Sequence, residues 1–126
     1  MPIVVTGLSH HSSPVELRER FAFSDAQIAD ALGQLREQGI ADESVILSTC
    51  NRVEIYAANR DDDPALGQVL RRFLCDFHSI DSVPGSELYT HRDPQSVDHL
   101  FRVSCGIDSM VLGETEILGQ LKQAYK

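Results

Sequence analysis

Four short stretches of the chain have the apolar or alternating pattern that is typical of β-strands. Residues 3–8 and 44–48 are short apolar runs, of which the second is expected to be a buried strand. Residues 53–57 alternate with a period of two, which predicts a strand with one face in water. A fourth strand is expected at residues 87–91.

Between and after these strands, apolar residues recur every three or four positions, as they do on the buried face of a helix. Two helix starts have the sequence of a capping box, one at Ser13, Pro14 and Glu16 and one at Ser24 and Gln27. Further helices are expected from residue 63, from residue 93 and over residues 115–126. The helix from residue 63 has the widest apolar stripe, formed by Leu66, Val69, Leu70, Phe73, Leu74 and Phe77.

The predicted order is therefore βαββαβ followed by two helices, which indicates an α+β fold of the ferredoxin-like sandwich type. We expect one antiparallel four-stranded sheet with helices packed on one face, plus C-terminal helices. The 126 residues are enough for one domain, residues 1–126. Because the last helical pattern has no C-cap signal, we expect the chain to be part of a longer protein.

Composition excludes several classes of function. The formal net charge of −8 argues against non-specific nucleic-acid binding, which depends on Lys and Arg contacts with phosphates. No apolar run approaches the roughly 20 residues of a membrane-spanning helix, and residues 1–5 lack the basic start and long apolar stretch that are typical of a signal peptide. A cytoplasmic location is expected. The 3 cysteines are too few for a disulfide framework, and no CxxC pair indicates a zinc site.

The most unusual stretch is residues 48–52, which places Cys50 in a tight connection between two expected strands, beside Arg52. A nearby cation favours the thiolate, which is the nucleophilic form of cysteine. A guanidinium also suits a carboxylate, because two parallel N–H donors meet its two oxygens. The alternative is an inert, half-buried cysteine in a hairpin, with Arg52 as a surface charge. These five residues alone do not decide between the two interpretations.

A second polar cluster occupies residues 106–120, where a loop bracketed by glycines leads into a helix. Its side chains offer donors and acceptors suited to an ammonium group and to a ribose or ester; these residues are Ser109, Glu114, Glu116 and Gln120. The alternative is an ordinary helix start at Gly113 or Thr115, with acidic residues near its positive end.

Among the histidines, His99 lies opposite the apolar stripe of its expected helix, so it faces either solvent or another segment such as a site. His10 and His11 follow the first strand, where adjacent side chains point to opposite faces, and no partner has metal-ligand spacing. We expect no metal site. The other histidines and cysteines are assigned to the surface (His78, His91) or to packing (Cys75, Cys105).

Three collinear motifs resemble the glutamyl-tRNA reductase family, which opens the five-carbon route to tetrapyrroles. They are GLSHH at residues 7–11 with Pro14, STCNRVEIY at residues 48–56, and GETEILGQ at residues 113–120. The resemblance implies that the Cys50 thiolate attacks the ester of glutamyl-tRNA to give a thioester. NADPH then reduces this thioester to glutamate-1-semialdehyde, the first step of porphyrin and haem synthesis from glutamate.

The resemblance also implies roles for individual residues. Arg52 is expected to bind the α-carboxylate of the substrate, with Thr49 and Asn51 orienting it. His99 matches the histidine that the family places near the reaction. The family's other substrate-binding positions match Ser109, Glu114, Thr115, Glu116 and Gln120.

One departure from the family limits these expectations. Members of the family continue with an NADPH-binding domain and a helical dimerisation domain. The 126 residues of this chain contain no GxGxxG motif. We therefore expect this chain to bind no NADPH and to complete no reduction. Glutamate-1-semialdehyde aminomutase, the next enzyme of the pathway, is a candidate partner of the full-length family. Two alternatives stay open: a non-catalytic interaction or regulatory module, and a ferredoxin-like binding domain unrelated to reductases.

Overall fold

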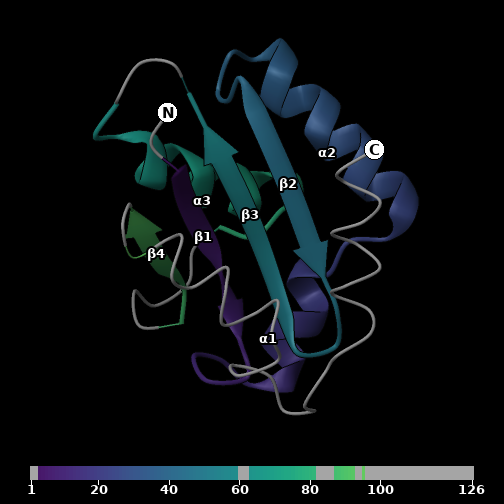
Figure 1. Ribbon diagram of the computed structural model, residues 1–126. Helices are drawn as coiled ribbons and strands as arrows, with labels where there is room; N and C mark the ends of the chain where they lie inside the picture. Colours follow the sequence, from purple (N-terminus) through teal and green to yellow (C-terminus); the bar gives the residue numbers. More distant parts are fainter. Residues whose placement is uncertain (1–2, 60–62, 82–86, 93–94, 96–126) are drawn as a thin grey trace.

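The computed structural model describes residues 3–59, 63–81, 87–92 and 95. The elements are, in chain order, β1 (Ile3–Ser9), α1 (Val15–Phe21), α2 (Asp25–Glu37), β2 (Glu43–Ser48), β3 (Arg52–Ala58), α3 (Leu66–Phe77) and β4 (Tyr89–Arg92). The four strands form one antiparallel sheet in the order β2-β3-β1-β4. Figure 1 shows α1, α2 and α3 together behind this sheet. The predicted ferredoxin-like order is confirmed, whereas the expected C-terminal helices lie outside the described residues.

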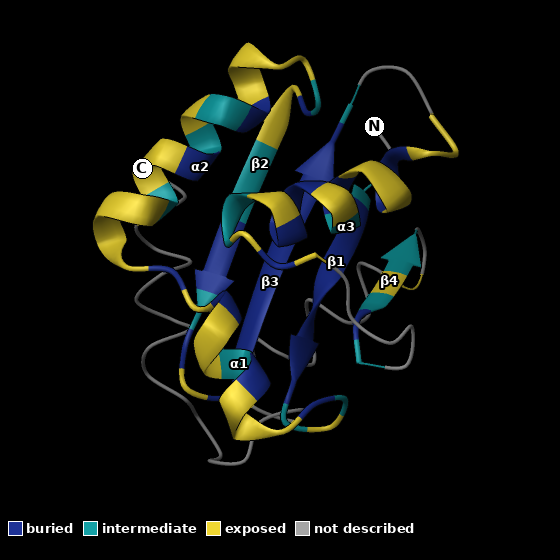
Figure 2. Cartoon of the chain, turned by 180° about the vertical axis from the view of Figure 1, so that it is seen from behind, coloured by how far each residue is buried: buried dark blue, intermediate teal, exposed yellow. Residues whose placement is uncertain are grey.

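The hydrophobic core lies between the sheet and the three helices. Figure 2, seen from the helix side, shows the buried faces of the helices turned toward the sheet. Every element except β4 contributes fully buried or nearly buried apolar side chains; examples are Leu8, Phe21, Leu35, Ile46, Ile55, Leu70 and Leu74. Burying a large apolar side chain stabilises the fold by roughly 1.5–3 kcal/mol. This shared core fixes the positions of β2 and β3, which lead into and out of residues 49–51.

The central strand β3 is buried along its whole length, so the predicted wet face is wrong. Val53 and Ile55 belong to the core beneath the helices. The intervening residues Arg52, Glu54 and Tyr56 point to the opposite face of the sheet and are buried there too. The alternating pattern correctly identified which residues share a face. It did not reveal that the polar side chains of the second face bond to one another instead of to water.

The segment before α1 differs from its prediction. The residue that caps α1 is Pro14, which has an extended conformation and makes no side-chain capping hydrogen bond. The hydroxyl of Ser13 instead donates to the carbonyl oxygen of Ser9 at 3.2 Å. The predicted capping box at Ser13 is therefore wrong, because this hydroxyl stabilises the turn that follows β1.

The second capping box is confirmed. Ser24 Oγ accepts the backbone N–H of Gln27 at 3.2 Å, and the Gln27 side chain accepts the backbone N–H of Ser24 at 2.8 Å. The helix α2 ends just before Gly39, whose φ of 70° is the left-handed conformation that follows many helices.

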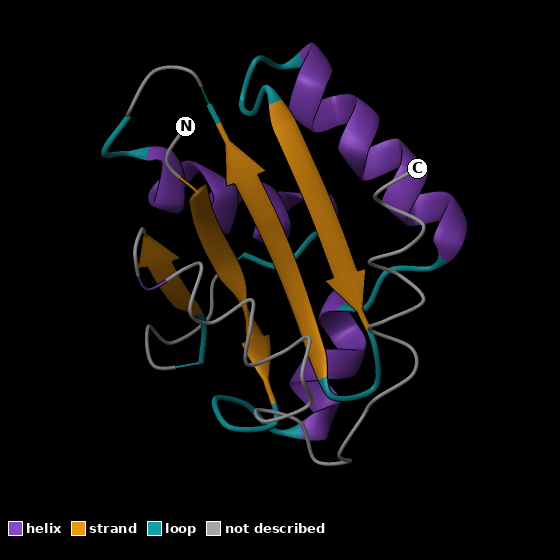
Figure 3. Cartoon of the chain, viewed as in Figure 1, coloured by secondary structure: helices purple, strands orange, loops and turns teal. Residues whose placement is uncertain are grey.

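Three smaller predictions are confirmed only in part (Figure 3). β2 lies at one edge of the sheet, so only Ile46 and Leu47 of this strand are buried. On α3 the predicted stripe is buried except at Phe77, which is half-buried, and at Val69, which is 38% exposed. The fourth strand begins later than predicted, at Tyr89.

Candidate active site

The turn between β2 and β3 has Cys50 at its exposed apex. The turn is closed by the backbone N–H of Thr49, which donates to the carbonyl oxygen of Arg52 at 2.9 Å. Inside the turn, the backbone N–H of Asn51 donates to Thr49 Oγ1 at 3.1 Å. Thr49 and Asn51 are 9% and 6% exposed. An accessible thiol therefore lies between two buried residues, so the turn has little freedom to move.

Two carbonyl oxygens of this turn are also held from outside. The backbone N–H of His10 donates to the carbonyl oxygen of Asn51 at 2.9 Å. Arg18 Nε, from α1, donates to the carbonyl oxygen of Cys50 at 3.3 Å. The segment from the end of β1 to α1 thus supports the turn that carries the thiol.

Arg52 follows the turn and is fully buried on the face of the sheet away from the helices. Its Nη1 lies 3.7 Å from Glu54 Oε1, which is longer than a hydrogen bond. The contact is an ion pair and not a bidentate fork. The interpretation of Arg52 as a surface charge is therefore wrong, because the side chain has no exposed surface.

The Glu54 carboxylate is held by two tyrosines. Tyr56 donates its hydroxyl to Oε1 at 3.1 Å, and Tyr89, from β4, donates to Oε2 at 2.6 Å. Burial, and then the charge of Glu54, raise the pKa of Tyr89. The phenol consequently stays protonated and remains a donor. Glu54, Tyr56 and Tyr89 were not predicted as a cluster, because Tyr89 is 35 residues away from Glu54 in the chain.

The structure brings together those predicted site residues that are close in the sequence, namely Thr49, Cys50, Asn51 and Arg52. The other predicted residues lie outside the described part of the chain: His99, Ser109, Glu114, Thr115, Glu116 and Gln120. Sequence reasoning missed Arg18, the arginine that contacts the backbone of Cys50. Nothing in the sequence pattern could have shown this contact, which spans 32 residues.

The structure also tests the predictions made for three histidines and for Cys75. The rings of His10 and His11 lie 3.9 Å apart in the turn after β1, so they do not point to opposite faces. His78 was assigned to the surface, but its ring is half-buried against the rings of Phe21, Phe23 and Phe77. Cys75 is buried, as expected for a packing role, and burial raises the pKa of its thiol.

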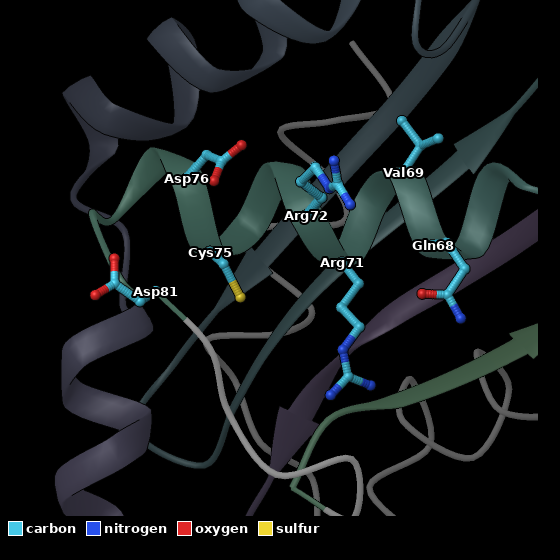
Figure 4. Close-up of a pocket in the computed structure, with 7 residues that line it drawn as sticks. All are labelled: Gln68, Val69, Arg71, Arg72, Cys75, Asp76 and Asp81. Carbon is cyan, nitrogen blue, oxygen red and sulfur yellow. The ribbon is translucent and has the colours of Figure 1, made fainter.

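A groove of about 640 Å³ runs along the outer side of α3 (Figure 4). It is lined by Gln68, Val69, Arg71, Arg72, Cys75, Asp76 and Asp81. The groove shares no residue with the Cys50 turn, and its charges are of both signs. It does not extend the candidate site.

In residues 3–59, 63–81, 87–92 and 95, no group of three or more His, Cys, Asp or Glu side chains could hold a metal ion. None of the helices in this part of the chain combines the length and the apolar character needed to cross a membrane.

Comparisons with known proteins agree with one another. The sequence profile of the family described as "Glutamyl-tRNAGlu reductase, N-terminal domain" matches residues 6–126. A glutamyl-tRNA reductase of Marinobacter nauticus is 49% identical over 126 residues, which cover 99% of this chain and 29% of that protein. One of Herpetosiphon aurantiacus is 48% identical over 128 residues, or 99% of this chain and 30% of that protein.

A solved structure is also similar. Glutamyl-tRNA reductase from Methanopyrus kandleri matches with a TM-score of 0.70 and 33% identity, over 98% of this chain and 27% of that one. The chain thus spans less than a third of the length of the proteins it matches.

Proposed function

Because this chain belongs to the glutamyl-tRNA reductase N-terminal domain family, we propose that its Cys50 forms a thioester with the glutamyl group of glutamyl-tRNA. The observation that carries the proposal is the exposed Cys50 at the apex of a turn whose flanking residues are buried. Such a turn presents a thiol to a large substrate while keeping it in one place, which is what nucleophilic catalysis requires.

The proposed step is an acyl transfer. The Cys50 thiol loses its proton, and its sulfur attacks the carbonyl carbon of the ester. A C–S bond forms, the C–O bond to the terminal ribose breaks, and the ribose oxygen takes up a proton. The products are a glutamyl thioester on Cys50 and free tRNA. A thioester accepts hydride more readily than an ester, so this step prepares the glutamyl group for reduction.

Arg52 is proposed to bind the carboxylate of the glutamyl group, with Thr49 and Asn51 shaping the turn beside it. One detail of the sequence-based expectation needs correction. The α-carboxyl of the glutamyl group is the ester carbonyl under attack, so the carboxylate left for Arg52 is the γ-carboxylate. Arg52 has no exposed surface in the structure, so this contact is proposed from the resemblance and from the match between a guanidinium and a carboxylate.

Further contacts with the substrate are proposed from the resemblance in sequence alone. His99 is assigned to the reacting group, in positioning it or transferring a proton. The remaining substrate-binding positions are Ser109, Glu114, Thr115, Glu116 and Gln120.

The second half of the reaction, hydride transfer from NADPH to the thioester, is assigned to the longer protein. The residues of this chain do not fit a dinucleotide, because the sequence contains no GxGxxG turn for a pyrophosphate. No step of the reduction is therefore derived from them. Dimerisation, transfer of the aldehyde to glutamate-1-semialdehyde aminomutase, and a cytoplasmic location belong to the same proposal for the longer protein.

The proposal is tested by intact-mass analysis after the chain is mixed with glutamyl-tRNA. We expect a mass increase of one glutamyl group, removed by hydroxylamine, because thioesters are cleaved by that nucleophile. Cys50→Ser should abolish the adduct. Cys75→Ser is the matched control and should keep it, because that thiol is buried in the core. A wild-type chain that stays unmodified while tRNA remains charged contradicts the proposal and favours a non-catalytic interaction module.

A further inference from the structure

Arg18 connects α1 with the turn that carries Cys50. Its Nε donates to the carbonyl oxygen of Cys50 at 3.3 Å, and its Nη1 donates to the carbonyl oxygen of Ser13 at 2.8 Å. Both acceptors are neutral backbone oxygens. The side chain is half-buried, so its guanidinium is held in place but still reaches solvent.

The charge of Arg18 is not neutralised within the described part of the chain. There, Arg18 forms no ion pair, and its Nη2 has no acceptor. Two N–H donors and a full positive charge are thus available beside the residue that carries the thiol. Arg52 differs in this respect, because it is fully buried and paired with Glu54.

The proposed substrate has a negatively charged group close to the ester that Cys50 attacks. The ester carbon that Cys50 attacks is attached to the terminal ribose of the tRNA, and the 5′ phosphate of that same nucleotide is the nearest negative charge on the RNA. Arginine binds phosphate through parallel, charge-assisted hydrogen bonds. On a chain with a net charge of −8, a local cation beside the thiol favours the approach of an RNA end.

We propose that Arg18 binds the 5′ phosphate of the terminal nucleotide and holds the Cys50 turn through the Cys50 carbonyl. This inference rests on the proposed function, and it adds a substrate-binding residue contributed by α1. The phosphate contact would fix the position of the ester relative to the sulfur, and phosphate contacts commonly have this positioning role.

The test uses two small substrates, 3′-O-glutamyl-adenosine and its 5′-phosphate, with mass analysis of the rate at which Cys50 is acylated. Arg18→Gln should slow acylation by the phosphorylated ester about tenfold or more, because the variant loses a charge-assisted hydrogen bond to the phosphate. Acylation by the unphosphorylated ester should change much less. Arg20→Gln is the matched control and should leave both rates unchanged, because Arg20 is an exposed arginine on the same helix.

Equal slowing of both esters by Arg18→Gln would overturn the phosphate assignment, since Arg18 would then act only on the turn or on the glutamyl carboxylate. Unchanged rates would overturn it as well. Arg18→Lys should recover part of the lost rate because it restores the charge. Circular dichroism checks that each variant keeps the wild-type fold.

A second measurement needs no acyl substrate. Alkylation of Cys50 by iodoacetate, an anion, is compared with alkylation by neutral iodoacetamide, and the modified peptide is quantified. Arg18→Gln should lower the ratio of the two rates severalfold, whereas Arg20→Gln should not change it. If the wild-type chain is acylated neither by these esters nor by glutamyl-tRNA, the proposed function fails. The alkylation ratio then still decides whether Arg18 offers an anion site beside Cys50, and an unchanged ratio overturns that site.

Discussion

Arg52 and Glu54 form a buried ion pair whose geometry depends on two phenols. Removing two charges from water is costly unless each is paired and hydrogen-bonded. Glu54 meets this condition because Tyr56 and Tyr89 each donate to one of its oxygens, while Arg52 supplies the opposite charge. The Arg52 guanidinium therefore lies beside its counter-charge before any substrate arrives.

The substitution Arg52→Lys tests whether the Arg52 side chain binds the carboxylate of the substrate. Lysine keeps the charge near Glu54 but lacks the planar pair of donors that matches a carboxylate. We expect the second-order rate of Cys50 acylation by glutamyl-tRNA to fall about tenfold or more, the effect of roughly 1.4 kcal/mol or more. The rate of acylation is measured by quenching the reaction at a series of times and determining the intact mass of the chain.

Thermal unfolding of the Arg52→Lys variant, followed by circular dichroism, shows whether the fold survives. A folded variant that acylates at the wild-type rate would remove Arg52 from the proposed site.

At the level of elements, the pairing of β1 with β3 determines where the Cys50 turn lies. Gly7 of β1 is paired with Glu54 of β3. A Cβ atom on Gly7 would lie 2.1 Å from the carbonyl oxygen of Val53 and 2.8 Å from the Cα of Glu54. Both are backbone atoms that a side-chain rotation cannot move, so the close approach of the two strands requires glycine.

Gly7→Ala should therefore destabilise the chain strongly, by about 2–4 kcal/mol or enough to prevent folding, because the two central strands must separate. The measurement is the free energy of unfolding in urea. Gly33→Ala is the matched control: Gly33 lies in α2, and a Cβ there meets nothing within 4 Å.

That control should stabilise the chain by roughly 0.5–1 kcal/mol, because alanine restricts the unfolded state and favours the helix. Equal stability of the two variants would show that β1 and β3 are not packed as described.

At the level of the whole molecule, an aromatic cluster at the end of α3 joins it to α1 and to the start of α2. The ring of His78 contacts Phe21 of α1 at 5.8 Å, Phe23 at 4.5 Å and Phe77 of α3 at 5.3 Å between centroids. Within the residues that the structure describes, the buried Nε2 of His78 has no hydrogen-bond partner. Burial lowers the pKa of His78, and a backbone contact with Phe21 partly opposes this effect.

The pH dependence follows from the direction of that shift. His78 takes up a proton more easily in the unfolded chain, where its pKa is about 6.5, than in the folded one. Its contribution to stability is therefore complete above that value and is lost as the pH falls below it. We expect the urea midpoint to decrease between about pH 7.5 and about pH 5.5, and to decrease less in His78→Phe. An equal decrease in both proteins would show that other groups cause the pH dependence.

Much of the fold could be predicted from the sequence, because it depends on local patterns. The first three strands and α2 appear where the period of apolar residues and the Ser24–Gln27 capping box place them. The turn at Thr49, Cys50 and Asn51 could be predicted for the same reason, since its residues are consecutive. Predictions failed where a polar side chain had more than one partner within reach, as at Ser13 and along the polar face of β3.

The sequence by itself determined the order of the elements, the position of Cys50 between two strands, and the resemblance to a reductase family. Each depends on neighbouring residues or on collinear motifs. Only the tertiary structure decided that Arg52 is buried with Glu54 and two tyrosines, and that Arg18 supports the Cys50 turn. These contacts join residues that are far apart in the chain, and packing of the helices and the sheet brings them together.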